Sequence, residues 1–343
     1  MGHEDAIKAQ ALGLGFDLVG IARLGPVETA EHFDRWLAAG RAGTMDYLAK
    51  KADIRRDSRL PYEGVASAIV VGLDYGGKEP PGPIARYARG DDYHEVMWAK
   101  LNALQDWLSG RLGREIRGRG FVDTGPILER DLARRAGLGW FGKNTNLINP
   151  KTGSFFFIGA LLVDLELEAD TPFEADRCGS CTACLDACPT NAFVAPRELD
   201  AQRCISYLTI ELRGSIPETL REAIGANIYG CDICQDVCPW NERFSQALRV
   251  EAFQPRHINA GDAPAVAREI LSLDEERYRK MYRGSAMKRA KREGLRRNAV
   301  VVLGNVGDAS DIALLQSARM TASANEREHI DWAIDRLRAR EGR

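Results

Sequence analysis

The sequence predicts a chain of three parts: an α/β or α+β region, a cysteine-rich insert and an all-helical region. Helical and strand-like patterns alternate over residues 1–167, and all eight cysteines fall within residues 168–255. Residues 256–343 contain short helix patterns separated by Gly-Asn and Gly-Asp turns, which is typical of stacked helical repeats of the HEAT type. A length of 343 residues also favours two or three domains over one small module.

Hydrophobic periodicity places helices and strands alternately along the first region. The expected helices span residues 4–14, 30–39 and 92–112, and the expected strands span residues 17–22, 68–73 and 155–167. A strand-to-helix passage covers residues 121–136, and turn residues at 149–153 precede the last strand. In the helical region, the expected helices span residues 263–271, 284–292, 296–303, 312–318 and 327–338.

The insert carries the most specific signal in the chain. Its cysteines are Cys178, Cys181, Cys184, Cys188, Cys204, Cys231, Cys234 and Cys238. The first four have the spacing C-x2-C-x2-C-x3-C-P, in which three thiolates hold one iron-sulfur cluster and the fourth, before a proline, reaches the other cluster. We therefore expect a ferredoxin-like domain with two 4Fe-4S clusters, which passes electrons one at a time.

The same geometry predicts how the eight ligands are divided. The first cluster is expected to be held by Cys178, Cys181, Cys184 and Cys238. The second cluster is expected to be held by Cys188, Cys204, Cys231 and Cys234. Cys204 departs from the pattern of a plain two-cluster ferredoxin, in which the second motif would supply this ligand itself.

Two other uses of the cysteines are disfavoured. Paired C-x2-C motifs also suit structural zinc sites, but zinc requires neither the four-cysteine run nor a proline after each last cysteine. Disulfides need an oxidising compartment, and no secretory hydrophobic segment follows Met1. Because no stretch reaches the ~20 apolar residues of a membrane helix, we expect a soluble, cytoplasmic protein.

The formal net charge of -2 hides a strongly basic stretch. Between Arg277 and Arg297 there are ten Lys or Arg residues and one acid, Glu293. A local surplus of positive charge in a near-neutral protein is typical of a surface that contacts a nucleic-acid backbone. The alternative is a solvated helix face, although charges on such faces usually alternate in sign.

Asp123 is a candidate acid, because it follows an apolar strand pattern and precedes a helix pattern. A carboxyl group in a poorly solvated pocket has a raised pKa and can donate a proton near neutral pH. The alternative is that Asp123 caps the following helix. Asp92 and His94 form a second candidate acid–base pair just before the long helix, where an acid could instead serve as the cap.

Several nucleotide and cofactor classes lack their motifs. The segment Gly137–Lys143 fits the phosphate-loop spacing G-x4-G-K, but Asn144 replaces the metal-binding Ser or Thr, and the segment follows a helix pattern rather than a strand. There is no C-x3-C-x2-C run that would cleave S-adenosylmethionine, and no dinucleotide fingerprint after a strand. Hydride transfer from a nicotinamide is therefore not indicated.

Ten segments spread over the chain together form a specific pattern. The longer ones are RYARGDDYH (86–94), VDTGPILER (122–130), AGLGWFGK (136–143), GSFFF (153–157), RCISYLTIEL (203–212), IYGCDICQ (228–235) and CPWN (238–241). Residues 284–286, 297–298 and 303–305 extend the pattern into the helical region. In these residues the chain resembles the epoxyqueuosine reductases, a family that completes the queuosine base of tRNA, over nearly its whole length.

The resemblance implies an N-terminal domain of the nitroreductase-like, cobalamin-binding kind that reductive dehalogenases also have. It implies a base-off cobalamin that receives electrons from the two 4Fe-4S clusters, and a HEAT-like C-terminal domain that binds tRNA. The implied activity is the two-electron reduction of epoxyqueuosine to queuosine at the wobble position of the anticodon. An external electron donor such as flavodoxin or ferredoxin is also implied, and we expect a monomer without a membrane partner.

The resemblance also implies roles for individual residues. Asp123 is the expected proton donor, supported by Asp92 and His94. The expected cobalamin contacts are Lys50, Asp123, Leu147, Ile158, Ser206, Cys231 and Asp232, and the expected tRNA contacts are Arg213, Lys288, Arg289, Arg296 and Arg297. The alternatives are a reductive dehalogenase-like cobalamin enzyme, disfavoured by the missing twin-arginine export signal, and a non-catalytic iron-sulfur protein that binds nucleic acid.

Overall fold

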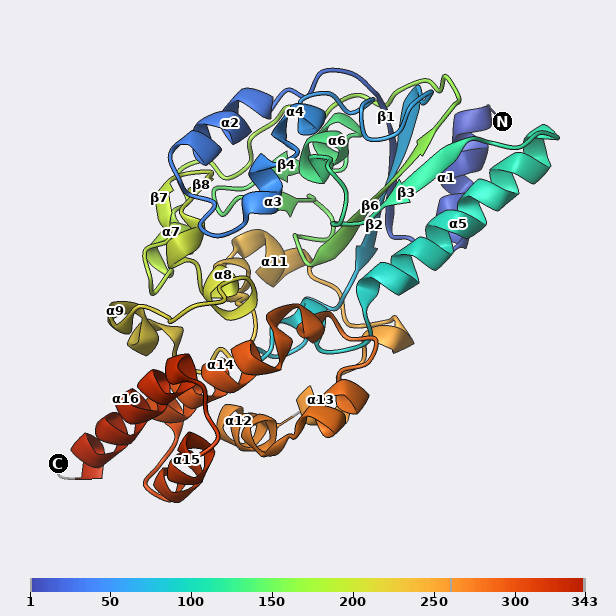
Figure 1. The fold of residues 1–343 in the computed structure, drawn as a ribbon. Coiled ribbons are helices and arrows are strands. Elements are labelled where there is room, and N and C mark those ends of the chain that lie inside the picture. The colour runs from blue at the N-terminus through green and yellow to red at the C-terminus, as the bar shows by residue number, and fades with distance from the viewer. Residues whose placement is uncertain (1, 260, 342–343) are drawn as a thin grey trace.

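The computed structural model describes residues 2–259 and 261–341, and three regions follow one another along the chain (Figure 1). A sheet with helices around it forms the N-terminal region, and the cysteine-rich segment lies beside it. The C-terminal helices lie at the end of the molecule opposite the N-terminus (Figure 1). Within the described residues, no helix is long and apolar enough to cross a membrane.

Four strands form the central sheet, in the order β1, β2, β6 and β3. They span Leu18–Arg23, Ser67–Asp74, Phe156–Val163 and Gly118–Phe121, respectively. Every neighbouring pair is antiparallel, with Val70 of β2 opposite Gly20 of β1 and Ala160 of β6. The region is therefore an α+β arrangement, because its helices do not connect parallel strands.

Helices cover both faces of the sheet, so β2 is buried along its whole length. The covering helices are α1 (His3–Gly13) and α5 (Tyr93–Leu112) on one face and α6 (Glu129–Arg135) on the other. Ile69 and Val71 of β2 pack with α1 and α5, whereas Ala68 and Val70 pack with α6. Successive residues of the strand thus enter opposite cores, as a period of two residues requires.

Helix α5 confirms the long helix that the sequence predicts at residues 92–112. Asp92 is its N-cap and accepts the main-chain N–H of His94, and Gly113 ends it in the left-handed conformation with φ 61°. Along the sequence, the shorter helices α2, α3 and α4 come between β1 and β2. They span Ala30–Ala38, Asp46–Ala49 and Ala52–Arg55.

The cysteine-rich segment contains only short elements. They are α7 (Ala183–Asp186), β7 (Phe193–Ala195), β8 (Glu198–Leu199), α8 (Ile205–Ile210), α9 (Glu218–Arg221), α10 (Ile233–Asp236) and α11 (Pro239–Phe244). A hairpin of β4 (Trp140–Phe141) and β5 (Leu147–Ile148) precedes β6. Trp140 and Ile148 of this hairpin pack against Cys238, so the segment shares a small core with the N-terminal region.

Five α-helices lie in the described part of the C-terminal region. They are α12 (Ala263–Ser272), α13 (Glu275–Met281), α14 (Lys291–Val306), α15 (Asp311–Arg319) and α16 (Ala324–Glu341). Helix α14 packs against both α12 and α16, and residues 295–304 are all buried. The prediction of two helices at 284–292 and 296–303 is wrong, because residues 286–290 form a 3-10 turn and one helix continues through buried arginines.

The hydrophobic core crosses the boundaries expected near residues 167 and 255. Ile84 and Ala88 of the first region, and Ile228 and Tyr229 of the second, belong to the same core as the C-terminal helices. Ile84 also forms a parallel bridge with Tyr229. The three regions are therefore joined by shared apolar packing rather than by linkers alone.

Candidate active site and cysteine centres

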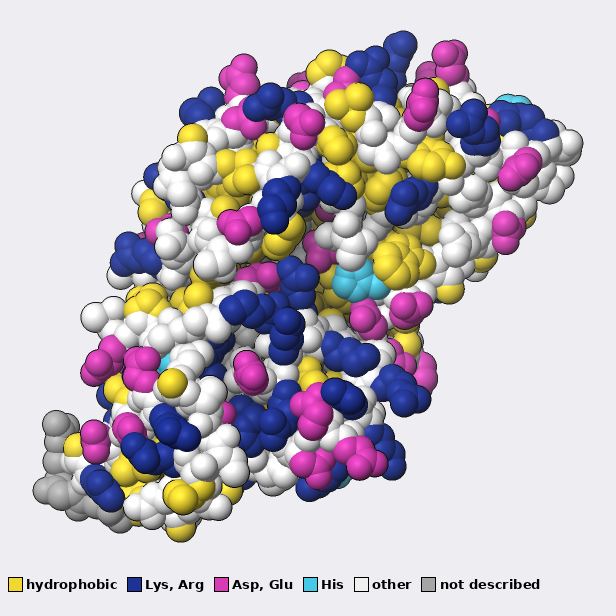
Figure 2. Space-filling model, viewed as in Figure 1, with side chains coloured by type: hydrophobic (Ala, Val, Ile, Leu, Met, Phe, Trp, Pro, Cys, Tyr) yellow, Lys and Arg dark blue, Asp and Glu magenta, His cyan; other side chains and the backbone are white. Residues whose placement is uncertain are grey.

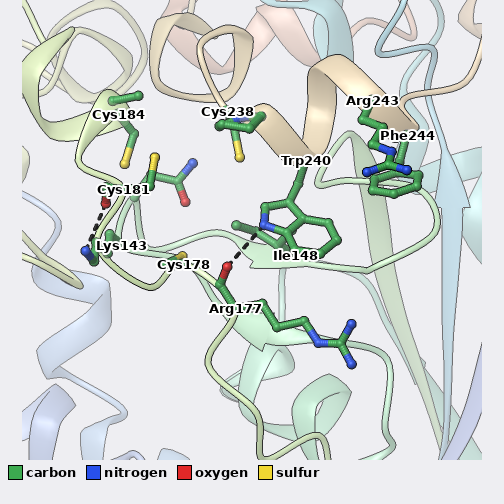
Figure 3. Close-up of a pocket in the computed structure, with 13 residues that line it drawn as sticks. Lys143, Ile148, Arg177, Cys178, Cys181, Cys184, Cys238, Trp240, Arg243 and Phe244 are labelled. Carbon is green, nitrogen blue, oxygen red and sulfur yellow. Dashed lines mark hydrogen bonds between the residues drawn. The ribbon is translucent and has the colours of Figure 1, made fainter.

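The first cysteine centre consists of Cys178, Cys181, Cys184 and Cys238, which line a cavity of about 370 Å³. Figure 3 shows the sulfur atoms of Cys181, Cys184 and Cys238 pointing toward a shared space. Trp140 donates its Nε1–H to Cys178 Sγ at 3.4 Å. Four thiols around one cavity fit the ligand set of a 4Fe-4S cluster, and the hydrogen bond to sulfur is of the kind that tunes cluster potential.

Lys143 and Asn144 hold both cysteine motifs from the turn between β4 and β5. Lys143 Nζ donates to the carbonyl oxygen of Gly179 at 2.7 Å and to that of Cys181 at 2.8 Å, and Figure 3 shows the second of these bonds. Asn144 Nδ2 donates to the carbonyl oxygen of Cys234 at 3.2 Å. The segment that matches the phosphate-loop spacing therefore organises the cysteine loops, and its lysine is engaged with main-chain carbonyls.

The second cysteine centre consists of Cys188, Cys204, Cys231 and Cys234, none of which is exposed. Burial raises the pKa of Cys231 to about 12, and the neighbouring Cys204 and Cys188 add to this increase. Burial also raises the pKa of Cys234 well above its usual range, with further contributions from Cys231 and Cys204. Buried thiols need a bound cation to ionise, and the iron of a cluster can supply that charge.

The two centres adjoin each other. Cys184 of the first centre is close enough to Cys234 of the second to add to the increase in its pKa. Over the described ranges 2–259 and 261–341, no three His, Cys, Asp or Glu side chains converge to hold a single metal ion. The thiols of the first centre instead surround a cavity, as a cluster of several atoms requires.

Asp123 lies on a tight turn between β3 and α6. Its φ is 56°, and Thr124 donates its main-chain N–H to the carbonyl of Val122 at 2.6 Å, which is the hydrogen bond of a γ-turn. A positive φ is strained for a residue with a Cβ atom, and such strain is concentrated at functional sites. The alternative interpretation of Asp123 as a helix cap is wrong, because α6 begins at Glu129 and its N-cap is Leu128.

Asp123 is exposed, but it contacts partly buried polar groups. Tyr93 Oη donates to Asp123 Oδ2 at 2.9 Å, and the Glu129 carboxyl is within hydrogen-bonding reach of the Asp123 main-chain N–H. Burial, and then the charge of Asp123, raises the pKa of Glu129 to about 8. Burial and the charge of Asp123 also raise the pKa of Tyr93. The sequence did not single out Glu129 or Tyr93, although both lie in the segments that carry the family resemblance.

Asp92 and His94 form a hydrogen-bonded pair, with His94 Nδ1 2.6 Å from Asp92 Oδ1. Burial favours a higher pKa for Asp92, but the hydrogen bonds from the His94 ring and main chain outweigh it and lower the pKa. The His94 ring stacks on Tyr93 at 4.1 Å between centroids. Its Nε2 atom is buried without a hydrogen-bond partner in the described part of the chain. Asp92 therefore both caps α5 and orients the histidine.

Arg289 connects the helical region to the N-terminal α+β region. Its Nε and Nη2 donate to the two carboxylate oxygens of Glu211 at 2.8 Å each, and its guanidinium lies over the Tyr47 ring at 5.3 Å. Arg213 donates to the carbonyl of Arg289 at 2.7 Å. Burial, Glu211 and also Asp123 raise the pKa of Tyr47. Arg289 therefore lies near Asp123, although Arg289 belongs to the helical region and Asp123 to the N-terminal region.

The basic stretch contains both exposed and buried residues. Lys288 and Arg289 are exposed. Figure 2 shows Lys and Arg side chains gathered over the helical region, near its junction with the N-terminal α+β region. Arg296 and Arg297 are only 6% and 2% exposed. Arg296 pairs with Glu326 at 2.8 Å, and Arg297 donates to the main-chain carbonyls of residues 208, 212 and 214. The prediction that these two arginines contact tRNA is therefore wrong.

The remaining predicted cofactor contacts come from several elements. Leu147 of β5 and Ile158 of β6 pack in one apolar cluster, and Ile158 is the one residue of β6 that is not fully buried. Lys50 is exposed at the end of α3, and Ser206 lies in the first turn of α8. The structure brings α8 beside the segment before α3, because Tyr207 Oη accepts the main-chain N–H of Thr44 at 2.8 Å.

Asp232, next to Cys231, has a buried carboxylate that is paired with an arginine. It accepts the main-chain N–H of Arg86 at 2.8 Å and the Nη1–H of the same residue at 3.1 Å. Arg86 also pairs with Asp236 at 2.7 Å. The arginine of the RYARGDDYH segment thus anchors the second cysteine motif to the N-terminal region.

Comparison with known proteins gives concordant matches that together cover nearly the whole chain. Residues 55–124 match the family model "Epoxyqueuosine reductase QueG, DUF1730", and residues 177–241 match the model "4Fe-4S double cluster binding domain". The chain is similar to an epoxyqueuosine reductase of Xanthomonas campestris, with 41% identity over 96% of this chain and 94% of that protein.

Solved structures agree with the sequence matches. The fold is similar to the epoxyqueuosine reductase of Streptococcus thermophilus, with a TM-score of 0.88 and 27% identity over 98% of this chain and 90% of that one. It is also similar to an epoxyqueuosine reductase crystallised with an epoxyqueuosine-modified tRNA stem loop, with a TM-score of 0.82 and 27% identity over 97% and 98% of the two chains.

Proposed function

The chain belongs to the epoxyqueuosine reductase family, and on this basis we propose that it reduces epoxyqueuosine in tRNA to queuosine with bound cobalamin and two 4Fe-4S clusters. The reaction removes one oxygen atom from an epoxide and consumes two electrons and two protons. Clusters that transfer one electron each can supply such a pair of electrons in sequence. The structural observation that carries the proposal is a strained, exposed acid near the basic rim of the helical region, in a chain that also holds two adjoining cysteine centres.

The two cysteine centres have different places in the electron path. The first centre has the exposed thiol of Cys181 and receives electrons from an external donor such as a flavodoxin or ferredoxin. The second centre lies next to it and delivers electrons toward the cofactor. Cys204 belongs to this centre and is the N-cap of α8. Ser206, which lies two residues later in the first turn of α8, would contact the cofactor.

Cobalamin would be held between the N-terminal region and the second cysteine centre, by the residues that the family resemblance assigns to it. Ile158 is partly exposed above the buried Leu147 and offers an apolar surface to a flat ring, while Ser206 and the main chain around Cys231 and Asp232 offer polar contacts. Lys50 supplies an exposed positive charge for the polar periphery of the cofactor. When bound, cobalamin would supply a strongly reducing metal centre for carbon–oxygen bond cleavage. The protein residues named here would orient it and exclude water from its face.

Asp123 donates a proton to the departing oxygen. The γ-turn holds its side chain outside the helix that follows, and the hydrogen bond from Tyr93 fixes one carboxylate oxygen at 2.9 Å. This leaves the other oxygen, Oδ1, for the substrate. The Asp92–His94 pair supports the same site from the start of α5 and keeps the histidine ring stacked beside Tyr93. General acid catalysis of this kind contributes about 10²–10⁴-fold in rate.

The tRNA binds across the junction between the helical region and the N-terminal α+β region. Exposed Lys288 and Arg213, together with Arg289 at the rim, place positive charge on one side of the site. Phosphates of an anticodon stem loop fit such a surface, and an unpaired base can extend into the site from a single-stranded loop. Arg296 and Arg297 are buried and stabilise this region through Glu326 and main-chain carbonyls, so they do not contact the phosphates.

Reconstitution tests the cofactor and the substrate separately. Protein purified without oxygen and supplied with iron, sulfide and cobalamin should retain corrin absorbance after gel filtration. With a reductant, it should convert epoxyqueuosine in a tRNA stem loop to a nucleoside lighter by one oxygen, which mass spectrometry detects. Loss of all corrin would leave an iron-sulfur protein that binds nucleic acid, and retained corrin without conversion of the tRNA would indicate another substrate for the same cofactor.

A further inference from the structure

Glu129 is a partly buried acid without a role in the reaction described so far. It is the first residue of α6 and follows the segment that carries Asp123. Its Oε1 atom is buried and has no hydrogen-bond partner within residues 2–259 and 261–341. A buried polar atom without a partner is destabilising, so its presence beside a strained catalytic turn indicates a functional use.

Groups from three other segments face the Glu129 carboxyl. Asp123 carries the charge that acts on it most strongly, and the Asp123 main-chain N–H is within hydrogen-bonding reach. Arg130 in α6 and Arg55 at the end of α4 are the positive groups that act on it. Tyr93 of α5, which donates to Asp123, is near both acids. Glu129 is therefore coupled to the acid proposed to face the substrate, and two arginines also act on its charge.

The stoichiometry of the reaction requires a second proton at this site. Both carbon–oxygen bonds of the epoxide break, a carbon–carbon double bond forms, and the oxygen leaves as water with two electrons and two protons. The Asp123 carboxyl holds one proton at a time. After it has protonated the oxygen once, it must be protonated again before the second transfer.

Resting on the proposed function, we propose that Glu129 is the proton reservoir of this site and returns one proton to Asp123 during each turnover. In this step the O–H bond of the Glu129 carboxylic acid breaks, and an O–H bond forms on the Asp123 carboxylate. Asp123 passes that proton to the departing oxygen. Glu129 remains as a carboxylate near Arg55 and Arg130, and solvent protonates it again between turnovers.

The protonation state of Glu129 agrees with this role. Burial, and then the charge of Asp123, raises its pKa to about 8. When Asp123 has become a carboxylate after its first proton transfer, the Glu129 carboxyl group therefore still holds its proton near neutral pH. Because it holds its proton tightly, it releases it only when Asp123 passes a proton to the strongly basic departing oxygen. Glu129 acts through Asp123 and does not contact the substrate, so it is a positioning and relay residue.

The Glu129→Gln variant tests the proposal, because glutamine keeps the size of the side chain but cannot store the proton. Glu31→Gln is the matched control, since the Glu31 side chain on α2 is 92% exposed. Single-turnover rates are measured against pH with the reconstituted full-length protein. Wild type and the control should lose rate as pH rises through about 8. Glu129→Gln should be about tenfold slower near neutral pH and lack this decline; an unchanged decline would overturn the proposal.

An infrared pH titration of the protein without tRNA provides a readout that does not depend on turnover. The wild-type protein should lose a protonated-carboxyl band as pH rises through about 8, and the difference spectrum against Glu129→Gln should isolate that band. Identical titrations of the two proteins would refute the reservoir. If the wild type instead fails to convert the tRNA while the band is present, the proposed function fails and the protonated Glu129 remains established.

Discussion

The two cysteine centres use the same ligand type and similar spacing, yet they differ in their access to solvent. Cys181 of the first centre is exposed, and Arg177 and Arg243 line the same cavity. None of the four thiols of the second centre is exposed, whereas burial raises the pKa of thiols in both centres, among them Cys184 and Cys234. The difference supports the proposed direction of the electron path, from an accessible first centre to an enclosed second one.

The same contrast separates other residues that look alike in the sequence. Lys288 and Arg297 belong to one basic stretch, but the first is exposed and the second is buried among carbonyl groups. Asp123 and Glu129 belong to one motif, but Asp123 is exposed and Glu129 has a buried oxygen. Residue type and spacing therefore identify candidates, whereas burial assigns their roles.

The largest expected effect comes from removing a ligand of the enclosed centre. Cys204→Ser should lower the iron and sulfide content toward half and reduce turnover by more than about 100-fold, since the cluster ligated by Cys204 lies between the donor and the cofactor. Cys181→Ser should be less damaging when a small chemical reductant replaces the protein donor. Equal losses in the two variants under that reductant would show that the order of the two centres is wrong.

The next largest effect should come from the acid and leave both centres intact. Asp123→Asn removes the proton but keeps the shape, so turnover should fall about 10²–10⁴-fold. Iron content and corrin absorbance should match those of the wild type. A variant with wild-type turnover would exclude Asp123 as the proton donor, and one that loses its clusters would assign it a structural role instead.

A smaller effect is expected at the rim of the exposed centre. Replacing both Arg177 and Arg243 with Glu should slow reduction by an acidic protein donor about tenfold, because long-range attraction sets the association rate. The rate with a small uncharged reductant should not change. Arg111→Glu, at the far end of α5, is the control. If the control slows the reaction equally, total charge rather than this rim determines the rate.

The basic stretch should respond to substitution in two different ways. Lys288→Ala combined with Arg213→Ala should weaken tRNA binding several-fold and flatten its salt dependence without changing the melting temperature. Arg297→Met leaves buried carbonyl groups without donors and should destabilise the fold by about 3 kcal/mol. Binding titrations and thermal unfolding separate the two outcomes; equal loss of tRNA affinity in a fully folded Arg297→Met variant would contradict the structural role.

A further prediction concerns the dependence of stability on pH. Between the ordinary glutamate pKa of 4.5 and about 8, the folded protein retains a proton on Glu129 that the unfolded chain releases. The free energy of unfolding should therefore fall as pH rises through this window, and Glu129→Gln should lack this part of the decline. Thermal unfolding of both proteins across this range measures the difference. Parallel curves would indicate an ordinary pKa for Glu129.

The sequence by itself determined the parts of this protein whose signals are local. Cysteine spacing predicts thiolate ligands for iron-sulfur clusters, since a tight loop of C-x2-C geometry is set by neighbouring residues. The long helix from Asp92 carries its own cap and its own apolar face. The family resemblance depends on the same kind of information, namely short segments of fixed residues.

Only the tertiary structure decided which chemically similar groups face solvent and which are enclosed. Glu129 acquires its raised pKa from burial and from Asp123 across a turn, and Arg297 is buried because it binds carbonyls about eighty residues earlier in the chain. The phosphate-loop-like segment likewise acquires its role from cysteine loops that follow it by dozens of residues. Such contacts depend on packing between distant segments, which residue type and periodicity do not encode.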